Sequence, residues 1–286
     1  MATGDRAIEI GLLVVGILIG AALGWLLVTR RTSKPSFLSS NEYWVYLPGA
    51  EMPDQNGIMK QVIGDNPYKS RGRNPITPRE GLLLSDTRLH MALVLRARNP
   101  HVFRPDLFDE HVEPTAQILA DLANSESLVK VRYISEQPLK DRASVQLLPH
   151  LADAVAELGG GRVIYDCMKE EIIDRESFRG LLTANPDLNQ ADVQVRPVWR
   201  RAEHGGWAET RGLRKIGLPE LATERMEADE QVLVTEVLGD AARKLWEAGE
   251  LLEKVDVRLF EDEFQVMVGK PKNRVSSVRI LRVQSV

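Results

Sequence analysis

The chain has a single cysteine, Cys167, among its 286 residues. One thiol cannot form a disulfide within the chain, and such sparse use of cysteine is compatible with a reducing compartment. Aromatic residues are few, at 6% of the sequence, and the formal net charge of −4 is slightly acidic. Dedicated nucleic-acid-binding proteins are usually basic, so we expect no nucleic-acid partner.

Motifs that hold nucleotides or metals are also missing. The triplet Gly159-Gly160-Gly161 follows an expected helix and precedes an expected strand, which reverses the order of a phosphate-binding loop. His101 and His111 flank acidic residues, but Pro100 and Pro105 make this segment a loop without the fixed spacing of a metal site. We therefore predict no cofactor and no metal.

Residues suited to covalent or acid–base chemistry do not form a coherent set. Cys167 follows an expected strand beside Asp166, and a nucleophilic cysteine needs a base such as histidine within reach. His150 lies one helix earlier, where a histidine is more often packed than catalytic. We predict no catalytic residues and a protein that is not an enzyme.

Only one long apolar run occurs, at residues 7–28, and Glu9 is its single charged residue. About 20 apolar residues at ~1.5 Å per residue span the roughly 30 Å core of a bilayer. The run is longer than the roughly 7–15-residue core of a secretory signal. We predict a retained transmembrane helix over residues 7–29, preceded by a short tail at residues 1–6.

Basic residues indicate the orientation of this helix. Arg30, Arg31 and Lys34 follow it, and Arg6 is the only basic residue before it. Because the side richer in lysine and arginine stays in the cytoplasm, we expect the N-terminus outside and the rest in the cytoplasm of a bacterial cell, at its inner membrane. Trp25 fits an interfacial aromatic residue.

The expected helix also has glycines at four-residue spacing, Gly16, Gly20 and Gly24. Four residues advance about 400° around a helix, so these glycines lie along one face. A face without side chains lets another helix approach closely, and close packing drives association in lipid. The expected partner is an integral membrane protein of a complex or a second copy of this chain.

Residues 30–80 show neither helix nor strand periodicity and are rich in proline, so we expect an extended arm. Its early aromatic residues need something to pack on: the lipid headgroups, the following domain or a partner. We predict a partner-binding arm, with a solvated linker as the alternative. The aromatic residues of this arm are Phe37, Tyr43, Trp44 and Tyr46.

Regular patterns begin near residue 82. They predict strands at residues 89–95, 129–134 and 162–165, with amphipathic helices near 111–124 and 144–158 between them. This order predicts an α/β layer with at least some parallel pairing.

Beyond residue 186 the patterns predict a strand at 193–199, a helix at 229–248 capped by Gly249, and two or three strands at the end. We expect one cytoplasmic α/β domain with a mixed sheet over residues 81–286. A division into two subdomains near residues 185–190 is the alternative.

Six basic residues lie near His204 and two tryptophans. They are a candidate site for a phosphate, an acidic partner or the membrane surface. The alternative is a solvated loop balanced by Glu203, Glu209 and Glu220. The six residues are Arg196, Arg200, Arg201, Arg211, Arg214 and Lys215.

Part of this passage resembles a segment of uncharacterised bacterial α/β domain families. The residues are Thr210-Arg-Gly-Leu213 and Lys215-Ile-Gly217-Leu-Pro-Glu-Leu221, followed by an amphipathic helix. Those segments often read Thr-His-Gly-Leu, and Arg211 stands where the histidine would be. The resemblance covers the last third of the chain and implies an α/β domain without implying an activity.

These features together predict a single-pass membrane-anchored accessory or scaffold subunit of a larger membrane protein complex. It would dock through its helix, its aromatic arm and its α/β domain. The alternative is a membrane-tethered enzyme or small-ligand sensor, with a site near Asp166, His150 or the basic cluster. A homodimer built by the helix alone is a third interpretation.

Overall fold

The computed structural model describes residues 38–63, 85–105, 108, 114–137, 139 and 141–283. The predicted transmembrane helix lies outside these residues. Within the described part of the chain, no helix is long and apolar enough to cross a membrane. Several predicted site residues also lie outside the described part: Gly16, Gly20, Gly24, Trp25, Arg30, Arg31, Lys34 and Phe37.

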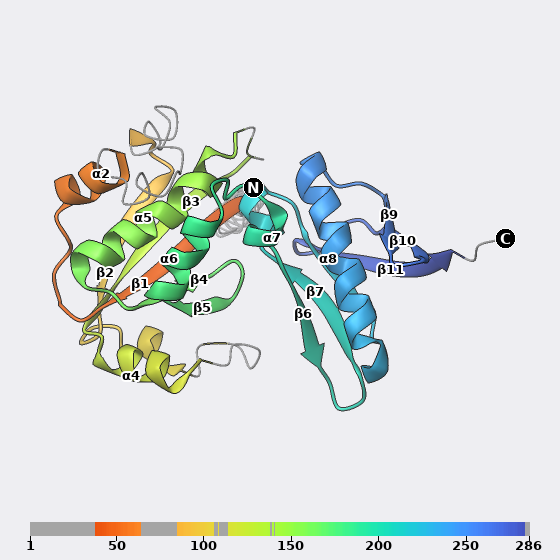
Figure 1. Ribbon diagram of the computed structural model, residues 1–286, viewed down its shortest axis with the longest axis horizontal. Helices are drawn as coiled ribbons and strands as arrows, with labels where there is room; N and C mark the ends of the chain where they lie inside the picture. The colour runs from red at the N-terminus through yellow and green to blue at the C-terminus, as the bar shows by residue number, and fades with distance from the viewer. Residues whose placement is uncertain are drawn as a thin grey trace, which may run out of the picture. The chain divides into compact units, whose positions relative to one another are not determined.

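The first of two sheets has five strands in the order β2-β3-β1-β4-β5 (Figure 1), and all neighbours are antiparallel. The strand β1 is central because it pairs with β3 along one side and with β4 along the other. The strands are β1 (Ser39–Leu47), β2 (Leu89–Leu95), β3 (Ser127–Ser135), β4 (Val163–Asp166) and β5 (Glu171–Asp174).

The central strand corrects the prediction of an extended arm over residues 30–80. Tyr43 and Tyr46 are 2% and 1% exposed, and Trp44 packs edge-on against Tyr165, so these aromatic residues lie in the domain's own core. A strand covered on both faces shows no apolar–polar alternation, which is why β1 lacked a strand signal. The domain begins at Leu38 rather than at residue 81.

Helices cover both faces of this sheet. One face carries the helix α5 (Ala143–Gly159), flanked by α2 (Gln55–Ile63) and α6 (Arg175–Ala184). The other face carries α4 (Ala116–Asn124) and the 3₁₀ helix η3 (Pro100–Phe103). As the glycine triplet indicated, α5 ends at Gly160, which has a φ of 65°.

The strands predicted at 89–95, 129–134 and 162–165 all form, but they do not pair as expected. Since β1 lies between β3 and β4, these two strands run parallel to each other without touching. The first sheet is therefore antiparallel and not mixed. The patterns did not predict β1, so β3 and β4 were expected to pair directly with each other.

The second sheet has six strands in the order β6-β7-β8-β11-β10-β9, and it is mixed because β8 and β11 are parallel. Its strands are β6 (Arg196–Arg201), β7 (Gly206–Arg211), β8 (Glu220–Thr223), β9 (Lys254–Leu259), β10 (Asp262–Val268) and β11 (Val275–Val283). The helix α8 (Gln231–Ala248) packs on this sheet and ends at Gly249, as predicted.

Short helices complete the second half. The strand predicted at 193–199 begins only at Arg196, as β6. The residues before it form the short helix α7 (Ala191–Gln194). The 3₁₀ helix η5 (Leu213–Ile216) connects β7 to β8, and η6 (Ala228–Glu230) leads into α8. The described residues thus form an α/β fold with two sheets, and η5 lies against β1 of the first sheet.

Candidate functional site

A buried lysine joins the two sheets. Lys215 in η5 is 0% exposed, and its Nζ donates to Asp166 Oδ2 at 2.6 Å, Gln194 Oε1 at 2.7 Å and Tyr43 Oη at 3.3 Å. The acceptors come from β4, α7 and β1. Together they provide a partner for each of the three N–H groups of the ammonium.

Glu220, the first residue of β8, holds η5 in place. Its buried carboxylate accepts hydrogen bonds from Thr210 Oγ1 at 2.8 Å and from the backbone N–H groups of Gly212, Leu213 and Arg214 at 2.9, 3.3 and 3.2 Å. Burial raises the pKa of Glu220, and these hydrogen bonds act in the opposite direction. The segment noted for its resemblance is therefore one hydrogen-bonded turn that presents Lys215 to the first sheet.

Gly212 brings this turn close to α7. Its φ is 117°, and a Cβ at this position would lie 2.1 Å from the carbonyl oxygen of Gln194. Only glycine fits such a backbone at such a distance. On the other side, Ser39 Oγ donates to the carbonyl oxygen of Lys215 at 2.8 Å, so that β1 and α7 both fix the turn.

The electrostatics of this group are those of a buried ion pair. Burial lowers the pKa of Lys215, and the charge of Asp166 opposes that change. Burial also raises the pKa of Tyr43 well above its usual value, and Asp166 adds to the effect. Tyr43 is therefore a neutral phenol that accepts from the lysine.

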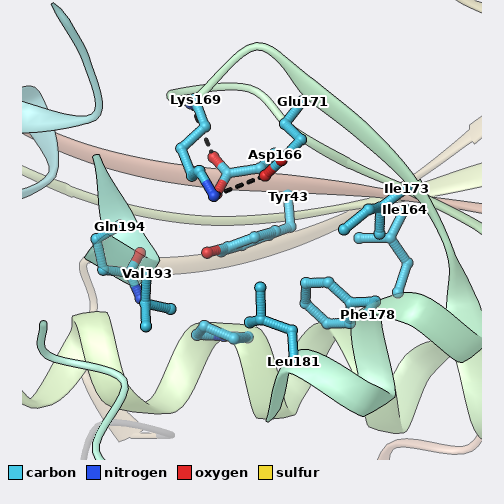
Figure 2. Close-up of a pocket in the computed structure, with 11 residues that line it drawn as sticks. Tyr43, Ile164, Asp166, Lys169, Glu171, Ile173, Phe178, Leu181, Val193 and Gln194 are labelled. Atoms are coloured by element: carbon cyan, nitrogen blue, oxygen red, sulfur yellow. Dashed lines mark hydrogen bonds and ion pairs between the residues drawn. The ribbon is translucent and has the colours of Figure 1, made fainter. Parts of the chain in front are cut away.

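The cavity beside the partners of Lys215 is small. A cavity of about 20 Å³ is lined by Tyr43, Asp166 and Gln194 among others, and that volume holds about one water molecule. Figure 2 shows Tyr43 between the charged side chains of Asp166, Lys169 and Glu171 on one side and Phe178 on the other, with its hydroxyl toward Gln194. The ion pair links the two sheets, since Lys215 lies in η5 and Asp166 in β4.

A larger groove, of about 530 Å³, lies next to the small cavity. We call it the α8 groove. It is lined by the β4–β5 turn, α7, the start of β6, the middle of α8 and the end of β9. Lys169 and Glu171 line both this groove and the small cavity. Gly239 lies on its wall, where a Cβ would press on Pro197 Cγ at 3.3 Å.

The α8 groove is lined by charges of both signs. Arg243 pairs with Asp192 at 3.0 Å and with Asp240 at 2.5 Å, and Lys169 pairs with Glu171 at 2.6 Å. Such pairs at the rim of a groove can exchange partners with a bound charged segment.

Two polar atoms of the groove lack partners. Arg196 Nε and Thr235 Oγ1 are buried and have no hydrogen-bond partner within the described residues. A buried donor without a partner costs about 1–3 kcal/mol. Both atoms are closed off from solvent behind the groove surface.

The predicted basic cluster is largely paired with glutamates. Arg200 and Arg211 both form ion pairs with Glu170 of the β4–β5 turn and with Glu209 of β7. Arg196 Nη2 donates to the carbonyl oxygen of Glu170 at 2.8 Å. Glu209 balances the cluster, as in the alternative interpretation. Arg200 is buried, and Arg196 and Arg211 are half-buried, so they do not form a solvated loop. They form a second link between the sheets.

Other candidates from the sequence do not form sites. Burial raises the pKa of the Cys167 thiol well above its usual value, which opposes formation of a reactive thiolate. No group of metal-ligating residues occurs in the part of the chain that the structure describes. His111 lies outside that part.

Comparisons with protein families, curated proteins and solved structures found no match to this chain. The candidate site is therefore defined by geometry. It consists of the α8 groove and the two sets of ion pairs, around Lys215 and around Glu170, that hold its walls together.

Proposed function

We propose that this chain is a single-pass membrane-anchored accessory or scaffold protein that docks a charged segment of a membrane partner in the α8 groove. The apolar run at residues 7–28 supports the anchor. The groove, with its paired charges, supports the docking. In this proposal the α/β domain lies on the cytoplasmic side of the inner membrane, and the protein is not an enzyme.

The α8 groove is the observation that carries the proposal. Its volume of about 530 Å³ lies within the roughly 300–1,000 Å³ range of ligand sites, but such sites are mostly apolar. Here Lys169, Asp240 and Arg243 are among the charged lining residues. A charged protein segment suits this lining better than an apolar small molecule.

The groove is also braced on both sides. Its walls come from the β4–β5 turn of the first sheet and from α7, β6 and α8 of the second half. The ion pair of Lys215 with Asp166 and the pairing of Glu170 with two arginines connect these walls. A site whose walls are already fixed loses less entropy when it binds a partner.

A membrane-tethered sensor of a small anion is the second candidate. Arg196 and Arg243 line the groove and favour it, because arginine binds carboxylate and phosphate groups well. This candidate predicts that a simple anion such as phosphate or citrate raises the melting temperature of the full chain. The docking proposal predicts no such shift.

The docking proposal is tested by isolating the tagged full chain from native membranes in mild detergent and identifying its companions by mass spectrometry. Glu236 lines the groove and is exposed, and Glu247 is exposed on the same helix outside the groove. A stoichiometric membrane partner should accompany the wild type and Glu247→Lys but be lost from Glu236→Lys. Isolation without a partner, or equal retention by both variants, would contradict the proposal.

The anchor has its own test. The full chain should stay with the membrane fraction after extraction at alkaline pH, because a spanning helix resists release. Replacing Gly16, Gly20 and Gly24 together by leucine should leave it in the membrane but weaken helix association. Release of the wild-type chain into the soluble fraction would exclude the anchor, and unchanged association of the leucine variant would exclude the glycine face.

A further inference from the structure

The last strand, β11, is longer than the strand beside it. Its nine residues end at Val283, and residues 278–283 pair with β10, but its pairing with β8 ends at Val278, which lies opposite Thr223. Among the described residues no strand adjoins the β8 side of residues 279–283. Figure 1 shows this part of β11 continuing toward the C-terminus.

The open edge presents unpaired backbone groups. The N–H of Glu220 donates to the carbonyl oxygen of Arg274 at 3.0 Å, so the even-numbered residues of β11 direct their N–H and C=O groups toward β8. Because this direction alternates along a strand, Ile280 and Arg282 carry donors and acceptors on the open edge. Such an edge is a template for another strand.

Apolar side chains are exposed at this end of the sheet. Leu281 and Val283 are 44% and 37% exposed, and Phe260 in the β9–β10 turn is 89% exposed. Glu263, near the start of β10, lies opposite Val283, so the β9–β10 turn lies at the same end of the sheet as residues 281–283. Exposed apolar side chains beside an unpaired edge indicate an interaction surface.

We propose that residues 279–283 pair antiparallel with the same residues of a second copy, with Leu281 on the two-fold axis. This register sets Arg279 opposite Val283 and Ile280 opposite Arg282, so no arginine faces another. A centre at Arg282 would set two arginines face to face, which is destabilising. A centre at Ile280 would require the edge of Val278, which β8 already occupies.

The same register satisfies the backbone. Ile280 and Arg282 of the two copies form hydrogen-bonded pairs, and Leu281 faces Leu281 as a non-hydrogen-bonded pair. The surface is identical on both copies, as a two-fold interface requires. It is independent of the α8 groove and adds self-association to the proposed docking function.

A pairing of five residues is small. Stable interfaces bury about 800 Å² on each partner, so we expect the strand pair to be weak. It rests on the proposed membrane anchor, because confinement to a membrane raises the local concentration of the chains. A trapping experiment is therefore the suitable test, because a disulfide captures a weak but specific contact.

The Leu281→Cys variant of the full chain is made in its membrane and is then mildly oxidised. A non-hydrogen-bonded pair places the two Cα atoms about 4.5 Å apart, within the range of about 4.4–6.8 Å for a disulfide. Met267→Cys is the matched control, because Met267 is 39% exposed on the same face but away from the edge. Leu281→Cys should form dimers about tenfold faster than Met267→Cys. The wild type should form none, because Cys167 is half-buried and its thiol has a raised pKa.

The register has a separate test. Arg279→Cys mixed with Val283→Cys should give a mixed dimer faster than either variant alone gives its own dimer. Equal rates for Leu281→Cys and Met267→Cys would overturn the proposal. Cross-linking of Leu281→Cys to a different protein would overturn it too, because another strand would then occupy the edge.

Discussion

Lys215 Nζ lies 2.6 Å from Asp166 Oδ2, and the two residues belong to different halves of the fold. Lys215 precedes β8 of the second sheet, and Asp166 ends β4 of the first. Burying two charges is costly, so such a pair stabilises a fold weakly, while loss of one member is strongly destabilising. The pair thus fixes how the walls of the α8 groove face each other.

Replacing Lys215 by methionine keeps most of its volume but leaves Asp166 without its cation. We expect the free energy of unfolding to fall by about 3 kcal/mol, since breaking a buried pair costs roughly 3–5 kcal/mol and Asp166 keeps hydrogen bonds from the N–H groups of Met168 and Lys169. Urea unfolding of Lys215→Met, Asp166→Asn and the double variant checks this. The double variant should lose clearly less than the sum of the two, and simple additivity would show that the pair is not coupled.

Replacing Glu220 by alanine removes the acceptor for three backbone N–H groups and for Thr210. Each buried donor left unpaired costs about 1–3 kcal/mol, so we expect a loss of roughly 3 kcal/mol or more. Glu220→Gln keeps one acceptor oxygen and should lose about half as much. The midpoints of urea unfolding rank the variants, and equal small losses would mean that the carboxylate does not hold η5.

Local patterns predicted most of the fold. The helices α5 and α8, their glycine ends and the strands β2, β3 and β4 all lie within a few residues of the predicted ranges, because each has a one-sided apolar pattern or a clear stop. The strand β1 was missed since both its faces are covered, so its sequence shows no period. That single omission also changed the expected pairing of β3 and β4.

The candidate site was less predictable than the fold. A lysine is almost never fully buried, so Lys215 was grouped with surface cations, and its partner Asp166 is 49 residues away in the sequence. No local spacing indicates such a contact. The signal that existed was the segment from Thr210 to Leu221, whose glycine and glutamate form the turn beneath Lys215.

The role of Gly212 is tested by adding one carbon atom. In Gly212→Ala the new Cβ would lie 2.1 Å from the carbonyl oxygen of Gln194 at a φ of 117°, so the turn or α7 must move. We expect a loss of more than about 3 kcal/mol in unfolding free energy. Gly180→Ala is the control: it lies inside α6 with open space at its Cβ and should gain up to about 1 kcal/mol. Similar effects of the two substitutions, seen by thermal unfolding, would contradict the close approach.

Asp86 makes the stability of the first sheet sensitive to acid. Its carboxylate bonds to the guanidinium of Arg88 at 2.6 Å and accepts from Tyr133 Oη at 3.1 Å, and chiefly the hydrogen bond from Arg88 lowers the pKa of Asp86 from 3.8 to about 2. The pKa of Asp86 is lower in the folded chain than in the unfolded chain. Its carboxylate therefore stabilises the fold fully at pH values above 3.8, which is the pKa in the unfolded chain. This stabilisation is lost as the pH falls through about 2, the pKa in the folded chain. Because Asp86 is partly exposed, we expect less than about 1 kcal/mol.

The measurement compares the wild type with Asp86→Asn by urea unfolding at several values between pH 6 and pH 2. The wild type should be the more stable protein at pH 6, and the difference should shrink steadily once the pH drops below 4. Arg88→Gln should reduce the same difference, because the guanidinium is the main cause of the lowered pKa of Asp86. A difference that stays constant across this range would mean that Asp86 titrates alike in the folded and unfolded chain.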